Sequence, residues 1–301
     1  MLVPLPRPFV LGVCFALIGA FLSSTPPFQN AMAMDANRCG IPVVYGFCRG
    51  VGSVSYAAAV LLLGFVLERH APTLLLPVFA ALTACGLLAM SGFRLPERPD
   101  EAADRPAERR SIAAVLRSHP RFALTLLGCM FFFLTHTISN TYMNALVGKA
   151  GGTASAVGTS LAISAVLELP AMTLVSRLQK RFSPGFFLRF AAGAEVVKFL
   201  IFYLAHSMPF IYLGQCMQFF QFAVYAPATV YYVAAALPER DQLKGQSLIY
   251  VAGSGLGGAL GNLLGGRLLD RSGIQAALLL GTVSAAASLL TFCLSTREDS
   301  R

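Results

Sequence analysis

The stretch RLPERPDEAADRPAERRSIAAVLRSHPR, residues 94–121, divides the chain into two parts of unequal length. It holds seven arginines and five acidic residues, with prolines near its start and at its end. On either side the sequence is almost continuously apolar, with three long apolar blocks before the stretch and six after it. A charged, proline-containing run between apolar blocks is typical of a linker between helical bundles, so we expect residues 94–121 to be a loop.

The composition indicates a membrane protein. Charged residues make up 12% of the 301 residues, hydrophobic residues 56%, and the mean hydropathy is +0.66. A soluble domain of this size carries roughly a quarter charged residues. The net charge of +9 does not indicate a nucleic-acid partner, because the arginines lie between apolar blocks. The seven cysteines include no CxxC pair, so neither a disulfide framework nor a metal site is predicted.

Each apolar block has about 20 or more residues, the length that a helix needs to cross roughly 30 Å of hydrocarbon. Lipid offers no partner for free backbone groups, so the blocks must be helical. We therefore expect an all-α integral membrane protein with about nine transmembrane helices, grouped as a partial N-terminal half (1–93), the loop (94–121) and a C-terminal six-helix half (122–301). The expected spans are residues 8–29, 46–67, 72–93, 122–146, 153–176, 185–205, 208–233, 246–268 and 274–295.

Lysines and arginines are distributed unequally between the two sides that nine spans define. With the N-terminus outside, the inner side collects sixteen positive residues and the outer side five. Because positively charged loops stay in the cytoplasm, we expect the N-terminus outside, the C-terminus inside, and a multi-pass protein of the plasma or inner membrane.

Among the ionisable residues within the expected spans, four stand out: Arg49, Glu168, Glu195 and Lys198. Such residues are costly in hydrocarbon and face a cavity, a partner or the headgroups. Arg49, at the start of its span, can reach the headgroups, and Glu195 and Lys198, three residues apart, can form an ion pair that only orients helices. Glu168, deep in its span and followed by Pro170, favours a solvated cavity, which we expect the other three to line as well.

Polar side chains recur at helical spacing on two further spans. His136, Asn140 and Asn144 are spaced by four residues, and Gln218 and Gln221 by three, so each set is expected to share a helix face. One such face alone is explained by hydrogen bonds between helices. Several polar faces together with an acid and a lysine predict a common polar cavity, that is, a solute pathway.

Another span carries glycine at every fourth position, at residues 253, 257, 261 and 265. The letters GSGLGG at 253–258 superficially fit a dinucleotide-binding fingerprint, but no strand precedes them. We expect a smooth face for close helix packing instead. A membrane enzyme would need a reactive group near Glu168 or His136, and the sequence offers no nucleophile there. We therefore expect neither an enzyme nor a cofactor.

Three segments resemble the lactose-permease-like and phenylpropionate-permease-like branch of the major facilitator superfamily. YGFCRGVGSVSYAAAVLLLG (45–64) resembles the motif YGRxRxWGSxGF that opens the fifth helix of that branch. HTISNTYMNALVGKAGGTASAVG (136–158) is similar to the seventh helix running into the eighth, and GNLLGGRLLDRSG (261–273) to the end of the eleventh. The resemblance implies that the nine spans are family helices four to twelve, so the first three are expected to be lacking. It also implies two halves that expose a midplane site alternately to each side.

The resemblance also implies roles for individual residues. Arg49 falls on the fifth-helix arginine that contacts sugar, Glu168 near the eighth-helix acid, and Lys198 on the ninth-helix arginine. Gln218 and Gln221 fall on a tenth-helix histidine and glutamate.

The chain departs from the family at two of these places. Glutamine does not titrate, so the tenth-helix part of the proton relay is interrupted, and coupling to a proton or another cation would have to use Glu168, Glu195 or His136, or be absent. The fourth-helix acid is not matched either: Asn30 occupies its neighbourhood, and Asp35 lies about one turn further on.

Together these observations predict a membrane transporter of a small organic solute, a saccharide or an aromatic or other organic acid, that works by alternating access. The alternative is a truncated, non-transporting membrane protein whose six-helix half serves as a binding or scaffold module. The candidate binding residues are Arg49, His136, Asn140, Asn144, Glu168, Glu195, Lys198, Gln218 and Gln221.

Overall fold

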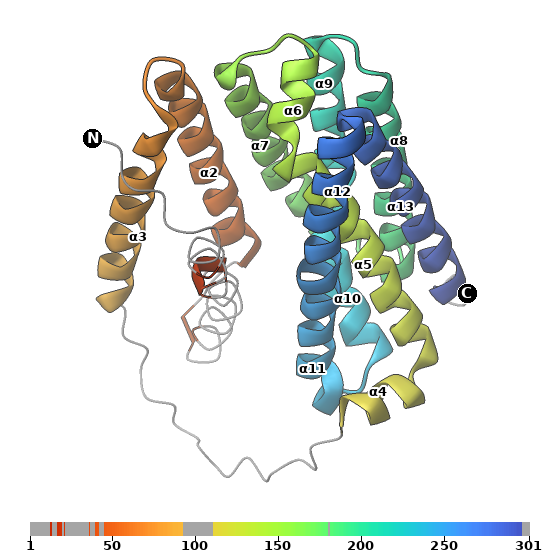
Figure 1. Ribbon diagram of the computed structural model, residues 1–301. Coiled ribbons are helices and arrows are strands. Elements are labelled where there is room, and N and C mark those ends of the chain that lie inside the picture. Colours follow the sequence, from red (N-terminus) through yellow and green to blue (C-terminus); the bar gives the residue numbers. More distant parts are fainter. Residues whose placement is uncertain are drawn as a thin grey trace. The chain divides into compact units, whose positions relative to one another are not determined.

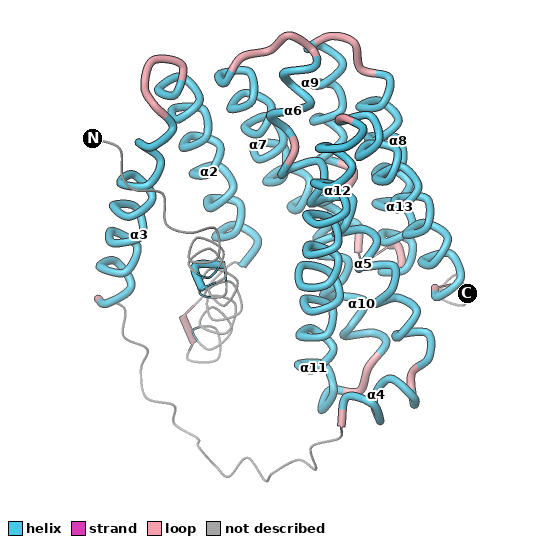
Figure 2. The backbone as a smooth tube through the Cα atoms, in the orientation of Figure 1, coloured by secondary structure: helices cyan, strands magenta, loops and turns pink. Residues whose placement is uncertain are grey.

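Helices make up all the regular structure in the described part of the computed structural model (Figures 1 and 2). The described residues are 13, 17–19, 21, 36, 40–41, 45–92, 111–179 and 181–296. The expected span at 8–29 therefore lies almost entirely outside them. The elements are α2 (Tyr45–Leu67), η1 (Pro72–Leu74), α3 (Leu75–Ser91), α4 (Ile112–Ser118), α5 (Pro120–Thr141), α6 (Met143–Lys149), α7 (Ala154–Leu178), α8 (Pro184–Leu204), α9 (Met208–Cys216), η2 (Met217–Phe219), α10 (Phe222–Ala236), α11 (Glu239–Tyr250), η3 (Val251–Gly257), α12 (Gly258–Ser272) and α13 (Ile274–Ser295).

Uninterrupted apolar blocks gave accurate helix boundaries. The last block was expected at 274–295 and α13 spans Ile274–Ser295. α2, α7 and α8 begin and end within two residues of the expected limits. In these segments hydropathy and backbone hydrogen bonding follow the same limits, because a membrane helix satisfies all its backbone groups internally.

Three other blocks are interrupted within their length. The block at 122–146 is divided at Tyr142, whose φ of −103° and ψ of 19° lie outside the helical region. The block at 208–233 is divided by the 3₁₀ turn η2. The block at 246–268 begins seven residues early, at Glu239, and contains the π-helical segment η3. Interruptions of this kind leave hydropathy unchanged, so the apolar pattern does not reveal them.

The expected loop at 94–121 is wrong in its last ten residues. The short helix α4 begins after Ser111, whose hydroxyl accepts a hydrogen bond from the Ala114 amide at 3.2 Å, the contact of an N-cap serine. α5 then begins at Pro120, a residue favoured in the first helical turn. Residues 93–110 lie outside the described part of the chain.

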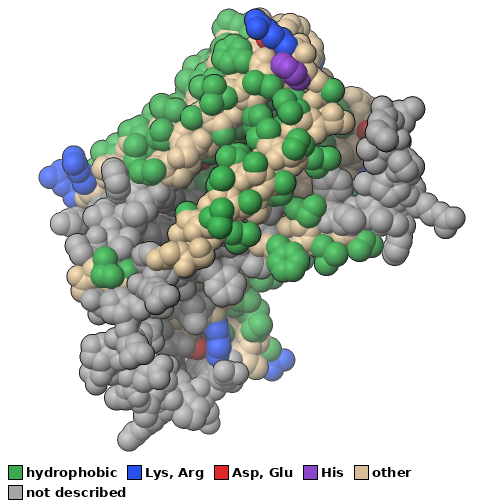
Figure 3. All heavy atoms as spheres, turned by 90° about the vertical axis from the view of Figure 1, so that its left-hand side faces the viewer, with side chains coloured by type: hydrophobic (Ala, Val, Ile, Leu, Met, Phe, Trp, Pro, Cys, Tyr) green, Lys and Arg blue, Asp and Glu red, His purple; other side chains and the backbone are tan. Residues whose placement is uncertain are grey.

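Six helices of the described part are long and apolar enough to cross a membrane. α8 is 21 residues long but carries Arg189, Glu195 and Lys198, and α3 is a shorter apolar helix. Figure 3 shows apolar side chains over most of the described surface in its view, with lysine and arginine at the margins. The six segments are Gly50–Leu67, Pro120–Thr141, Ala154–Val175, Met208–Ala236, Lys244–Ser272 and Ile274–Ser295.

The chain divides into two compact units. One holds residues 49–79 and 104–301, and the other holds residues 1–48 and 80–103. Most of α3 belongs to the second unit, where its leucines are largely exposed, Leu88 at 73%. All the contacts discussed below lie within the first unit.

Two apolar cores hold the helices of the first unit together. Side chains of α5, α8, α10 and α13 form one, around Phe132, Tyr225 and Phe292. The other, around Phe199 and Phe202, joins α5, α6, α8, α9 and α13. α5 and α13 are also joined by a hydrogen bond from the Ser288 hydroxyl to the Gly128 carbonyl at 2.9 Å.

The glycine face of η3 and α12 packs against α5, which confirms the expected close packing. A Cβ on Gly261 would lie 2.6 Å from the Leu134 carbonyl oxygen, and one on Gly265 would lie 2.6 Å from the Tyr142 ring. Gly253 faces the Phe133 ring in the same way. Small residues here let two helix backbones approach closely.

Candidate functional site

Four polar side chains from four elements form one hydrogen-bonded series inside the first unit. Ser53 of α2 donates from its hydroxyl to Oε2 of Glu168 on α7 at 2.8 Å. Gln218 of η2 donates from Nε2 to Glu168 Oε1 at 3.1 Å. Lys198 of α8 donates from Nζ to Gln218 Oε1 at 3.0 Å. The series therefore connects an ammonium to a carboxylate through a single amide, and we call it the polar relay.

The charged end of the polar relay is withdrawn from the surface. Lys198 is 1% exposed and Gln218 is 4% exposed, whereas Glu168 and Ser53 are half-buried. A buried ammonium is costly unless it is paired and hydrogen-bonded. Gln218 supplies the acceptor and joins Lys198 to Glu168, and Glu195 lies three residues before Lys198 on the same helix. The polar end of the relay toward α2 is the part that water or a solute can reach.

One helix break, the 3₁₀ turn η2, adjoins the polar relay. Gln218 lies in η2, the 3₁₀ turn between α9 and α10, and Pro170 lies inside α7 two residues after Glu168. Proline removes one helical hydrogen bond, and 3₁₀ segments within longer helices often mark functional hinges. Interrupted membrane helices provide free backbone groups and room for ligands near the bilayer midplane. The local sequence therefore places Gln218 at a helix break and Glu168 beside a proline within a continuous helix.

Two further buried side chains near the polar relay lack hydrogen-bond partners. Glu195 and Gln221 are both 0% exposed, and neither the carboxylate oxygens of Glu195 nor the amide of Gln221 bonds to a described residue. The ion pair between Glu195 and Lys198 that the spacing allowed is thus not formed as a hydrogen bond. Unsatisfied buried polar groups cost about 1–3 kcal/mol each, so these two are available to water or a ligand.

His136 and Asn140 of α5 form a second polar group. Asn140 Nδ2 lies 3.1 Å from His136 Nε2, and the His136 ring stacks on Phe222 of α10 with centroids 4.3 Å apart.

Asn144 does not continue that face as the sequence predicted. The interruption at Tyr142 places Asn144 on the separate short helix α6, where it is exposed. The spacing of four residues defines a common face only along an unbroken helix, and α5 ends at Thr141.

Arg49 is the candidate about which least is shown. Its backbone lies in the first turns of α2, four residues before Ser53, while its side chain lies outside the described part of the structure. Its role in the site stays a prediction.

Ser53 is the site residue that the sequence analysis missed. It lies on a face of small residues that recurs along α2 at Gly50, Ser53, Ala57 and Gly64. That face packs on α7: Ala57 shares a buried cluster with alanines of α7, and Gly64 adjoins Gly158. The sequence signal for Ser53 was a stripe of small residues along α2 in which one residue carries a hydroxyl group.

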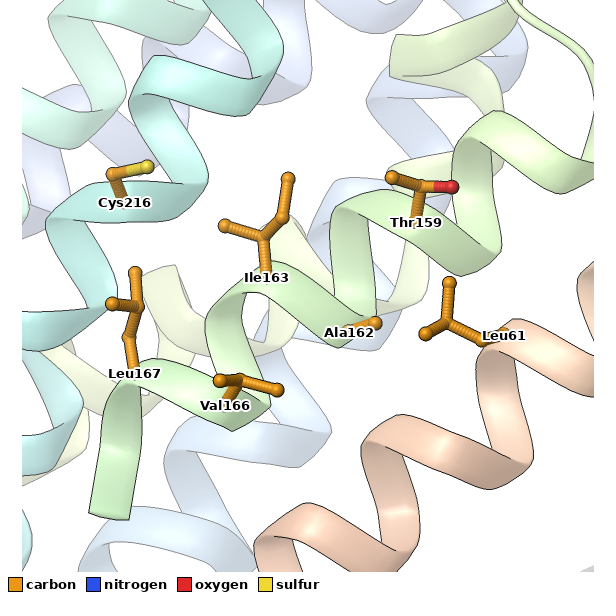
Figure 4. Close-up of a pocket in the computed structure, with 7 residues that line it drawn as sticks. All are labelled: Leu61, Thr159, Ala162, Ile163, Val166, Leu167 and Cys216. Atoms are coloured by element: carbon orange, nitrogen blue, oxygen red, sulfur yellow. The ribbon is translucent and has the colours of Figure 1, made fainter. Parts of the chain in front are cut away.

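An apolar pocket adjoins the contact between α2 and α7 and is not suited to a polar solute. It has a volume of about 380 Å³ and is lined by α7 together with Leu61 of α2 and Cys216 of α9 (Figure 4). Thr159 is its one hydroxyl-bearing residue, and that hydroxyl donates to the Ser155 carbonyl at 2.8 Å. The polar relay, and not this pocket, is therefore the candidate binding site.

Two bacterial proteins align with nearly the whole chain. Maltose permease of Geobacillus stearothermophilus is 29% identical over 290 residues, which are 95% of this chain and 72% of that protein. The uncharacterized transporter YwbF of Bacillus subtilis (strain 168) is 23% identical over 297 residues, 98% of this chain and 72% of that protein. Both are membrane transporters by name, so the expectation that the chain is not an enzyme is confirmed.

The fold also matches a solved transporter. The crystal structure of the major facilitator superfamily transporter FucP in the outward conformation superposes with a TM-score of 0.53 at 19% identity. The match covers 76% of this chain and 59% of the FucP chain. In addition, the family model of the MFS_1 like family matches residues 5–280. The chain therefore belongs to the MFS_1 like family of the major facilitator superfamily, as its own motifs predicted, and is a multi-pass membrane protein.

Proposed function

We propose that the chain acts in alternating-access transport of a small polar solute, and that the polar relay is where the solute binds. The observation that carries this proposal is the continuous series Ser53–Glu168–Gln218–Lys198 beside the helix break at η2. A solute hydroxyl can replace Ser53 on Glu168 and so enter the series without leaving a buried group unpaired.

The charge of the site favours a neutral saccharide over an organic acid. Among the described side chains, two carboxylates, Glu168 and Glu195, act on one ammonium, Lys198. A further negative charge from an acid would add repulsion, whereas sugar hydroxyls both donate to carboxylates and accept from amides. The similarity to a maltose permease supports the same class of solute.

Coupling to a cation needs a group that can bind one. Gln218 and Gln221 do not titrate, so we propose that a coupling cation binds at the carboxylate oxygens of Glu168, which the solute also uses.

We also propose nine membrane spans with the C-terminus inside. The charge distribution supports this orientation. A contact of Arg189, whose guanidinium donates to the Thr296 carbonyl at 3.0 Å, brings the start of α8 and the end of α13 together, as expected if both lie on one side of the membrane.

The test is equilibrium binding of radiolabelled maltose to the purified protein and to Glu168→Gln. The wild-type protein should bind saturably, and Glu168→Gln should lose about ten- to a hundredfold in affinity, as expected for one charge-assisted hydrogen bond of about 1.5–3 kcal/mol. The matched control is Asp270→Asn, an exposed carboxylate of α12 remote from the relay in sequence, which should bind as wild type. Equal binding by Glu168→Gln would remove Glu168 from the site, and binding without any transport would favour a non-transporting binding protein.

A further inference from the structure

α2 and α7 run antiparallel along a narrow line of contact, which we call the seam. Later residues of α2 contact earlier residues of α7. The contacting pairs are Ser53 with Glu168, Gly64 with Gly158, and Glu68 with Thr153. The backbones come close, since a Cβ on Gly158 would lie 2.6 Å from the Val60 carbonyl oxygen.

The middle of the seam contains only small or apolar side chains. Ala57 on α2 and Ala162 and Ala165 on α7 are buried together, with Val60 and Leu61 packed against them. Alanine and glycine bury little apolar surface, and the hydrophobic effect does not favour helix association in lipid. The packing of the seam is therefore close but only weakly cohesive.

A carboxylate fastens each end of the seam, and the two carboxylates come from opposite helices. At one end Glu168 of α7 accepts from Ser53 of α2 at 2.8 Å. At the other end Glu68, directly after α2, accepts from the Thr153 hydroxyl at 2.7 Å and from the Ser155 amide at 3.3 Å. The two ends are fifteen residues apart on either helix, which is about 22 Å.

Glu68 performs the capping of α7 that the helix does not perform for itself. Thr153 is the N-cap residue of α7 but makes no capping bond with its own helix. A carboxylate at a helix N-terminus is favoured by the free amides and by the helix dipole. The Ser155 and Thr153 side chains, together with the Arg69 charge, lower the pKa of Glu68, so its carboxylate remains ionised at neutral pH.

We propose that the seam is a gate held shut by its two carboxylate contacts, with Glu68 as the latch at the α7 N-terminus and Ser53 as the positioning residue that holds Glu168 at the polar relay. Loss of either contact leaves only small-residue packing, and the helices separate more often. That the seam opens during transport rests on the proposed function, whereas the contacts of the seam and their test are independent of it.

The test measures how often water enters the seam, without any solute. Ala57→Cys is introduced into the chain after its seven native cysteines are replaced, and its reaction with N-ethylmaleimide is followed in membranes. Ala57 is 2% exposed. A thiol reacts only as thiolate, and burial in apolar surroundings suppresses that form, so the labelling rate reports opening.

Glu68→Gln should raise the labelling rate about two- to fivefold, as expected for an exposed polar contact. Ser53→Ala should raise it about threefold or more, because its bond is to a partly buried carboxylate. Thr153→Val should act like Glu68→Gln, because both substitutions weaken the same contact between Thr153 and Glu68. For the same reason the variant that carries both substitutions should label no faster than the faster of the two single variants. Asp270→Asn removes an exposed carboxylate outside the seam and should leave the rate unchanged.

Unchanged labelling in both Glu68→Gln and Ser53→Ala would overturn the proposal, and so would an equal rise in Asp270→Asn. If Ala57→Cys does not insert, Ala162→Cys reports from the opposite helix of the same seam, where Ala162 is 4% exposed. Because no solute is present, a failure of maltose binding would leave this result unaffected, and the two proposals can fail separately.

Discussion

At the scale of single residues, Gln218 is the link on which the polar relay depends. Its amide bonds both to the Lys198 ammonium and to the Glu168 carboxylate. Among the described residues, Lys198 has no other hydrogen-bond partner, and Glu168 has only the Ser53 hydroxyl besides. The amide therefore lies between the Lys198 ammonium and the Glu168 carboxylate and keeps them from forming a direct ion pair.

We predict that Gln218→Ala lowers the free energy of unfolding by about 2–4 kcal/mol, because it leaves the buried Lys198 ammonium without its acceptor and removes one hydrogen bond from the half-buried Glu168. The measurement is the thermal midpoint in detergent. The control is Gln246→Ala, whose amide donates to the Val230 carbonyl at 3.2 Å near the surface, and which should cost about 1 kcal/mol or less. Equal midpoints for the two variants would mean that Gln218 is not a structural link.

Sequence reasoning found the charged members of the site but not their connection. Glu168 and Lys198 were identifiable because ionisable residues in spans are costly. Ser53 was not, because a serine in a membrane helix usually bonds to its own backbone. The grouping of Asn144 with His136 was wrong, because it assumed an unbroken helix through Tyr142. Side-chain bonds between distant helices depend on packing, which a single span does not encode.

At the scale of elements, interruptions within helices were harder to predict from the sequence than the positions of the helix ends. Hydropathy predicted α2, α7, α8 and α13 closely, since burial in lipid and helix formation impose the same length. It did not predict η2 or η3, because the change from α-helical to 3₁₀ or π-helical hydrogen bonding leaves side-chain polarity unchanged. The breaks nevertheless place Gln218 at the site.

Close approach of α2 and α7 gives a prediction for glycine. Gly158→Ala should destabilise the protein by about 1–3 kcal/mol, because the new Cβ meets the Val60 carbonyl oxygen, a backbone atom that cannot easily move. Gly193→Ala on α8 is the matched control: nothing lies within 4 Å of its Cβ, so it should stabilise by about 0.5–1 kcal/mol. Thermal midpoints in detergent measure both. A stabilising Gly158→Ala would show that the seam is looser than described.

At the scale of the whole molecule, the chain is a member of the major facilitator superfamily whose described part is helical. The orientation is the part that charge alone predicts. We expect a fluorescent protein fused after Arg301 to fluoresce in the cytoplasm, and alkaline phosphatase at the same position to be inactive. An active phosphatase there would place the C-terminus outside and reverse the assignment of every loop.

The central claim is that a saccharide crosses the membrane by way of Glu168. The most direct measurement is maltose uptake into proteoliposomes that contain the protein as the cell produces it, beside the same preparation of Glu168→Gln. The account predicts saturable uptake by the wild type and none above background for Glu168→Gln at equal amounts of inserted protein. Uptake by Glu168→Gln at the wild-type rate would contradict it.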